Sequence, residues 1–159
     1  MNPARLKVDS FGRPLCRCGC GEPVGKGRRT FAGHQCVHEW RLRTDPGYLR
    51  DQTFLRDHGV CRKCGLDTER ARKSIRGATT PEQRKEALKF RALGFPPGNR
   101  TWWNADHIVE VVRGGGECGL DNIQTLCLVC HKLKTRELAA ERAAERAIER
   151  HGPMLRNLP

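Results

Sequence analysis

The stretch from Trp103 to Lys134 reads W-N-A-D-H-I-V-E-V-V-R-G-G-G-E-C-G-L-D-N-I-Q-T-L-C-L-V-C-H-K-L-K. Its first apolar run carries Asp106 and His107 and breaks at three consecutive glycines. A second run, residues 123–128, begins directly after Asn122, and a long helical pattern follows it. This order predicts a strand, a loop, a second strand and a helix.

Two C-x-x-C pairs accompany this stretch, Cys61 with Cys64 ahead of it and Cys127 with Cys130 inside it. Structural zinc sites use four thiolate or imidazole ligands in a tetrahedron. Two matched pairs therefore predict a closed zinc site, although 62 residues separate them. A redox function is less favoured, because two pairs are present and neither has a βαβ context. Cys118 joins neither pair, and we interpret it as a buried or loop thiol.

A second candidate zinc site lies near the N-terminus, in the pattern C-R-C-G-C-G followed by F-A-G-H-Q-C. The glycines between and after these cysteines permit a tight, knuckle-like backbone. The candidate ligands are Cys16, Cys18, Cys20, His34 and Cys36. Free buried thiols are the alternative explanation for some of them.

The order Asp106-His107, Asn122, His131 within this cysteine frame resembles the HNH endonuclease family, especially its members with four zinc-binding cysteines. The resemblance implies a ββα-metal core that cuts DNA to 5′-phosphate and 3′-hydroxyl ends. It implies that Asp106 and His131 hold one divalent ion, Mg²⁺ or Mn²⁺ or another. An irregular backbone at His107 would turn its side chain toward the phosphate, where it would draw a proton from water. Asn122 would hydrogen-bond the hairpin loop and so hold His107 in place.

Each of these residues alone also has a simpler explanation. An Asp-His pair at a strand end is common, and Asp121-Asn122 suits a turn. His131, directly after a zinc pair, could instead serve that zinc site. Together and in this order they favour the nuclease. Glu110 stands where many relatives have proline, and it either assists the metal or faces solvent.

The charge of the chain favours a polyanionic partner. Its formal net charge is +12, and residues 106–159 hold eight basic and eight acidic residues, so the surplus lies in residues 1–105. Charge alone fits a basic protein without a nucleic-acid role equally well. The predicted DNA contacts are Arg72, Lys73, Arg76, Arg113, Lys132 and Lys134.

The chain predicts a small α+β, zinc-stabilised fold in four parts. Residues 1–40 form a leader with the zinc knuckle, and residues 41–60 form a linking helix. Residues 61–136 form the HNH core, interrupted by a basic helical insertion at 67–101. Residues 137–159 form a C-terminal helix and tail.

Three helices have sequence signals. Asp45 can cap the linking helix and Gly59 suits its end. Thr80-Pro-Glu-Gln predicts a capping box on a helix that ends near Ala92. Repeats of A-A-E-R predict a helix over residues 134–150, either a solvated strut or a surface for a protein partner.

The sequence predicts an intracellular location, in the cytoplasm or at the nucleoid. No apolar run is long enough to span a bilayer, and the first ten residues lack the apolar block of a secretory signal. Nine cysteines without such a signal indicate metal ligation rather than disulfides. The small size and knuckle leader suggest a phage or mobile-element source.

The function that these patterns favour is a metal-dependent DNA endonuclease. The alternative is a non-catalytic zinc-ribbon DNA-binding module, such as a packaging or regulatory factor. A protein–protein adaptor built on the knuckle and the long helix fits the charge less well.

Overall fold

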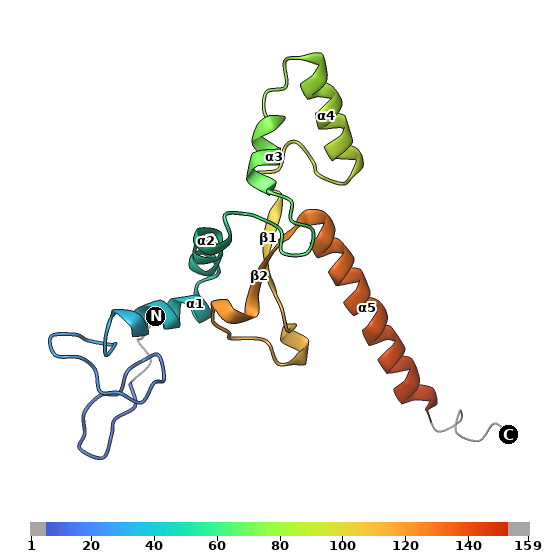
Figure 1. The fold of residues 1–159 in the computed structure, drawn as a ribbon. Coiled ribbons are helices and arrows are strands. Elements are labelled where there is room, and N and C mark those ends of the chain that lie inside the picture. The colour runs from blue at the N-terminus through green and yellow to red at the C-terminus, as the bar shows by residue number, and fades with distance from the viewer. Residues whose placement is uncertain (1–5, 153–159) are drawn as a thin grey trace. The chain divides into compact units, whose positions relative to one another are not determined.

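The computed structural model describes residues 6–152 (Figure 1). These residues divide into two compact units. Within this range, unit 1 comprises residues 6–56 and 107–124, and unit 2 comprises residues 57–106 and 125–152. The last residues of the predicted tail, 153–159, lie outside the described residues.

Two strands pair in a sheet, β1 (Trp103–His107) and β2 (Ile123–Cys127). They are antiparallel: the Ile108 amide donates to the Asn122 carbonyl at one end (2.8 Å), and the Leu128 amide donates to the Trp102 carbonyl at the other (3.0 Å). Strand β1 runs regularly through His107, and the bend begins at Ile108. The irregular backbone expected at His107 thus begins directly after it, where β1 ends.

Unit 1 holds two helices and two short 3-10 turns. They are α1 (His34–Thr44), α2 (Pro46–Asp57, whose last residue belongs to unit 2), η1 (Val111–Arg113) and η2 (Leu120–Asn122). The Asp45 carboxylate accepts the Tyr48 amide at 3.0 Å, so the predicted cap of the linking helix is confirmed.

The predicted linking helix is α2, which begins at Pro46 after the Asp45 cap and ends two residues before Gly59. The prediction that residues 41–60 hold this helix alone is wrong, because they also include the end of α1, a separate helix. Helix α1 crosses the expected boundary between residues 40 and 41. Its N-cap, Gly33, makes no side-chain hydrogen bond, and no acidic residue lies in its first turn. These are the signals by which a helix start is recognised in a sequence, and α1 lacks both.

The interior of unit 1 is small. Leu42 is 4% exposed, and Thr53 is fully buried with its hydroxyl on the Leu49 carbonyl (2.7 Å). Phe31 packs against Trp40 with ring centroids 5.6 Å apart. A core of this size makes a metal staple plausible for this unit.

Unit 2 holds three helices, α3 (Thr68–Ser74), α4 (Pro81–Ala92) and α5 (Leu128–His151). The capping box and the end of α4 are as predicted, with Thr80 and Gln83 bonding reciprocally. Helix α3 was not predicted, since its charged segment has no apolar periodicity. Helix α5 begins six residues before the predicted Lys134, because the Cys127 sulfur caps it by accepting the Cys130 amide.

The core of unit 2 lies where α3, α4 and the hairpin meet. Trp102 has no exposed surface, and its ring centroid lies 5.2 Å from Phe90 and 5.0 Å from Phe95. Its indole nitrogen donates to the Pro96 carbonyl at 3.0 Å. The insertion at 67–101 is thus packed on the hairpin through its aromatic residues rather than being a free loop. Cys61, Cys127 and Cys130 belong to the same buried cluster.

Among the helices of the described residues, none combines the length and the apolar character that a bilayer crossing requires.

Candidate active site and cysteine groups

The first cysteine group is formed by Cys61, Cys64, Cys127 and Cys130, whose sulfurs all lie within 4.8 Å of one another. The first pair lies in a knuckle, where the Gly65 amide donates to the Cys61 carbonyl at 2.8 Å. Gly65 has a φ of +72°, the left-handed conformation that favours glycine. The second pair opens α5. We call these four residues the core group.

The buried thiols of the core group differ in their pKa values. Burial raises the pKa of the Cys61 thiol, but backbone amides at Cys127, Cys64 and Lys63 and the Cys64 thiol outweigh burial and lower the pKa to about 7. Burial and the neighbouring Cys127 thiol raise the pKa of Cys130. Negative charge therefore concentrates on Cys61, and a divalent cation would release the remaining thiol protons.

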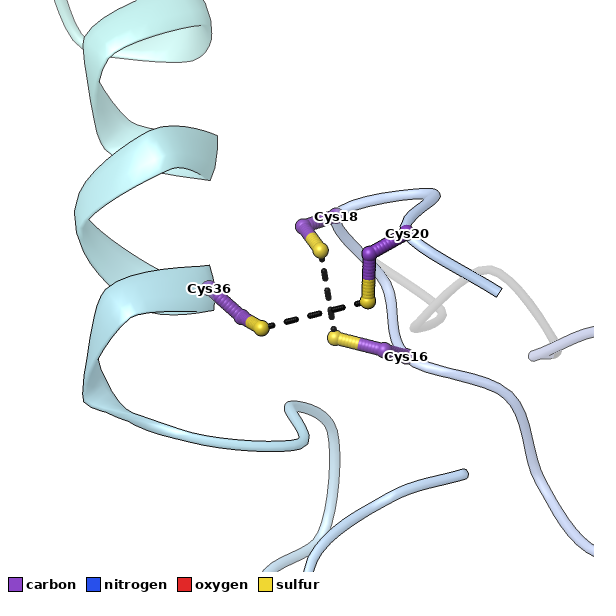
Figure 2. Close-up of side chains that lie close together, drawn as sticks. All are labelled: Cys16, Cys18, Cys20 and Cys36. Carbon is purple, nitrogen blue, oxygen red and sulfur yellow. Dashed lines mark hydrogen bonds between the residues drawn. The ribbon is translucent and has the colours of Figure 1, made fainter. Parts of the chain in front are cut away.

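The second group joins Cys16, Cys18 and Cys20 to Cys36, and we call it the leader group (Figure 2). Cys36 lies on α1, and the other three come from the glycine-rich turn facing it (Figure 2). The amide of Ala32 donates to the Cys16 sulfur at 3.2 Å. His34, the fifth candidate ligand, is not part of the group.

The leader group shows the same uneven protonation. Burial raises the pKa of Cys16, but the backbone amides of Ala32 and Cys18 and the thiols of Cys18 and Cys36 lower it to about 7. Burial and the Cys16 thiol raise the pKa of Cys18 to about 12.

Both groups fit zinc. Ligands at the usual Zn–S distance of about 2.3 Å occupy corners of a tetrahedron about 3.8 Å apart. The Cys64 and Cys127 sulfurs lie 3.8 Å apart, and the Cys20 and Cys36 sulfurs lie 3.9 Å apart. Four-thiolate sites of this kind are structural rather than catalytic, since they leave no open position.

Asp106, at the end of β1, meets the first turns of α5. Its Oδ1 lies 3.7 Å from Nε2 of His131, and its Oδ2 accepts from Nζ of Lys134 at 2.8 Å. His131 and Lys134 are three residues apart and so share one face of α5. The Asp106 side chain is 15% exposed and that of His131 is 37% exposed, so the pair is reachable from solvent.

The Asp106–His131 pair fits a divalent ion. Two ligands with bonds of about 2.1 Å to one ion lie at most about 4.2 Å apart, and a carboxylate with an imidazole is a common donor set for first-row divalent metals. Lys134 was predicted as a DNA contact, and in the structure its Nζ donates to the Asp106 carboxylate. Its position one turn after His131 is the sequence signal that could have identified this contact.

Asn122 organises the loop between the strands. Its Oδ1 accepts the Val109 amide at 2.8 Å, and its Nδ2 donates to the carbonyls of Val109 (3.1 Å) and Gly115 (2.9 Å). Gly115 packs so closely on Val109 that an added Cβ would lie 1.8 Å from its carbonyl oxygen. The predicted loop-holding contacts of Asn122 are therefore present, in the segment that follows His107.

Arg56 supports the same segment, a role that sequence analysis missed. From α2, its guanidinium donates to the Leu120 carbonyl at 2.5 Å and to the Ile123 carbonyl at 2.7 Å. These carbonyls lie on either side of Asn122. No sequence pattern distinguishes Arg56 from Arg50, the other arginine of its helix.

Among the remaining candidate residues, some form ion pairs and others are exposed to solvent. Arg72 donates to Glu69 at 3.1 Å, and Arg113 lies 3.9 Å from Glu110, so Glu110 has a basic neighbour. Four predicted DNA contacts are exposed: Lys73, Arg76, Arg113 and Lys132. Cys118 belongs to neither cysteine group.

A two-stranded hairpin that leads into a helix, with Asp-His, Asn and His in this order, defines an HNH nuclease fold. A family model described as HNH endonuclease matches residues 97–137. The crystal structure of the human ZRANB3 HNH domain is 34% identical, with a TM-score of 0.50, and the match covers 67% of this chain and 98% of that one. The chain belongs to the HNH endonuclease family.

Two further relatives carry the name DNA annealing helicase and endonuclease ZRANB3. The Mus musculus protein is 36% identical over 91% of this chain and 16% of its own length. The Homo sapiens protein is 34% identical over 87% and 15%. The chain thus spans about one sixth of the length of these curated relatives.

Proposed function

We propose that this chain is a metal-dependent nuclease that hydrolyses phosphodiester bonds in DNA and leaves 5′-phosphate and 3′-hydroxyl ends. The observation that carries the proposal is the Asp106–His131 pair, 3.7 Å apart, in a chain of the HNH endonuclease family. Relatives named as endonucleases support the same activity.

Asp106 and His131 would hold the divalent ion, Mg²⁺ or Mn²⁺. When bound, such an ion acts as a Lewis acid that stabilises charge on the phosphate and on the leaving oxygen. Lys134 keeps one carboxylate oxygen of Asp106 occupied, so the other is directed to the His131 side. The salt bridge fixes the Asp106 rotamer and offsets part of its negative charge before an ion arrives.

His107 is the proposed general base. A neutral imidazole carries an unprotonated ring nitrogen, so it can take a proton from the attacking water and then release it. Asn122, through its bonds to Val109 and Gly115, is a positioning residue for the backbone that directly follows His107. Loss of Asn122 would change the aim of the base rather than its chemistry.

The DNA substrate is supported by the net charge of +12. Free thiols arranged as metal ligands suit a reducing compartment, so we place the activity inside the cell.

The test is cleavage of supercoiled plasmid by the zinc-loaded full chain, with and without added Mg²⁺. Wild type should nick the plasmid only with the ion, and His107→Ala should lower the rate by at least about 100-fold, as loss of a general base does. His58→Asn removes an imidazole elsewhere, at a residue with a φ of +53° that asparagine tolerates, and should keep the rate.

If DNA ligase seals the nicks without any other treatment, the ends are the 5′-phosphate and 3′-hydroxyl that we propose. Unchanged cutting by His107→Ala would remove the general-base assignment. DNA binding without any cutting by wild type would leave a non-catalytic DNA-binding module.

A further inference from the structure

Unit 2 contains a half-open cavity of about 500 Å³ between the end of α3 and the loop that precedes β1. Its lining residues are Arg72, Ile75, Arg76, Gly77, Pro97, Gly98, Asn99 and Arg100. All of them belong to the insertion at 67–101. We call this feature the arginine cavity.

The arginine cavity is strongly positive. Three of its eight lining residues are arginines, and none is acidic. In the described part of the chain, neither Arg76 nor Arg100 takes part in an ion pair. Arg72 donates one Nη to Glu69, and its buried Nε–H has no hydrogen-bond partner. A buried donor without a partner is costly, so these arginines have unused capacity for an anion.

The other walls suit more than a bare anion. Ile75, 7% exposed, and Pro97 supply apolar surface, and Asn99 adds an amide that can donate and accept. A volume of about 500 Å³ lies within the range of sites for small organic ligands and exceeds what one phosphate fills. Arginine planes can also stack on a base.

The cavity lies within reach of the proposed metal site. Arg100 precedes Asp106 by six residues, which span at most about 22 Å even when fully extended. One DNA molecule can therefore contact both places.

We propose that the arginine cavity binds one nucleotide of a DNA strand, with its phosphate on Arg72, Arg76 and Arg100, apart from the phosphate that is cut. This rests on the proposed function, since it takes DNA as the substrate. Bidentate arginine–phosphate contacts are among the stronger hydrogen bonds, and each neutralised phosphate makes affinity depend on salt.

Two double variants, each losing two arginine charges from unit 2, provide the test. Arg76→Gln/Arg100→Gln changes the cavity, and Arg84→Gln/Arg91→Gln removes two exposed arginines of α4 that do not line it. Binding of a fluorescent single-stranded 12-mer to the zinc-loaded full chain is measured by anisotropy, without Mg²⁺, across a salt series.

The cavity variant should bind about tenfold more weakly, and the slope of log affinity against log salt should fall by up to about 0.7, the value for one neutralised phosphate of a single strand. The α4 variant should lose less than about twofold and keep the slope. If the two variants lost equal affinity, the effect would come from net charge rather than from the cavity, and the proposal would be overturned.

A second measurement separates a DNA strand from free phosphate. The side-chain Nε–H signals of Arg72, Arg76 and Arg100 are followed by NMR during titration with the 12-mer, with dAMP and with inorganic phosphate. The strand and dAMP should shift all three at concentrations where inorganic phosphate does not. A stronger response to inorganic phosphate would mean a free-anion site and contradict the proposal.

Plasmid cutting distinguishes the two proposals. If wild type cuts and the two double variants bind DNA equally well, the nucleotide-binding proposal for the arginine cavity is refuted and the nuclease proposal stands. If only the cavity variant loses DNA binding but wild type does not cut, the nuclease proposal is refuted and the nucleotide-binding proposal stands.

Discussion

The two cysteine groups have the same four thiols but close very different lengths of chain. The Cys64 and Cys127 sulfurs of the core group come from residues 63 positions apart, and those of Cys20 and Cys36 in the leader group from residues 16 apart. In the core group Cys61, Cys127 and Cys130 are buried; in the leader group only Cys16 is. Closing the longer loop constrains the unfolded chain more.

The two groups also differ in what their ligands adjoin. Cys127 and Cys130 open the helix on which His131 and Lys134 meet Asp106, so the metal would fix the start of that helix. The leader group ties a glycine-rich turn to α1. The comparison predicts that zinc in the core group holds unit 2 and the proposed metal site, whereas zinc in the leader group orders its own surroundings.

The largest expected effect is that of Cys61→Ser. Cys61 is 1% exposed and carries the low pKa of its group. Structural zinc contributes roughly 10–16 kcal/mol in zinc-finger peptides, about as much as the whole stability of a typical domain. We expect bound zinc to fall from two ions per chain to one, and unit 2 to unfold. Far-UV circular dichroism and zinc analysis measure this; a variant with one zinc and an unchanged melt would break the comparison.

A smaller effect is expected for Cys36→Ser, the matched change in the leader group. Zinc should again fall to one ion per chain, but α3, α4 and α5 should persist, because none of them contributes a ligand to this group. Limited proteolysis should cut within residues 16–36 and spare residues 57–152. Cleavage spread evenly over the chain would show that the leader group also holds unit 2.

The rate of zinc loss sharpens the same contrast. Cys20 is exposed and Cys18 and Cys36 are partly so, whereas three of the four core thiols are buried. A chromogenic chelator should therefore remove zinc in two phases, the faster by at least about tenfold. Cys36→Ser should lack the fast phase, and a single phase in wild type would mean that burial does not control access to the metal.

Residue order predicted the hairpin, the helix after it and both cysteine groups, because these depend on local spacing. Asp106 and His131 were predicted from the family resemblance, and the hairpin brings them within 3.7 Å. Helix α1 was missed because its first turn has neither a capping side chain nor an acidic residue. The arginine cavity was missed because Arg72 and Arg100 lie 28 residues apart and become neighbours only when α3 and α4 pack on Trp102. Local patterns carry no information about such packing.

Arg56→Met gives the smallest expected effect and tests what holds the part of unit 1 that lacks leader-group ligands. Segment 107–124 contributes no thiol to that group, yet Arg56 ties it to α2 through the Leu120 and Ile123 carbonyls. Methionine keeps the length of the stem and removes both donors. Because the first bond is exposed, we expect a loss of about 1–2 kcal/mol rather than the full value of two charged hydrogen bonds.

The loss should be local. Hydrogen exchange of the Val109 amide, which Asn122 accepts, should accelerate about tenfold, the factor that corresponds to about 1.4 kcal/mol, while amides of α5 stay protected. Arg56→Lys, which keeps one cationic donor, should fall between wild type and Arg56→Met. If Arg56→Met left the Val109 amide unchanged and Cys36→Ser accelerated it, the leader zinc rather than Arg56 would be what orders the loop after His107.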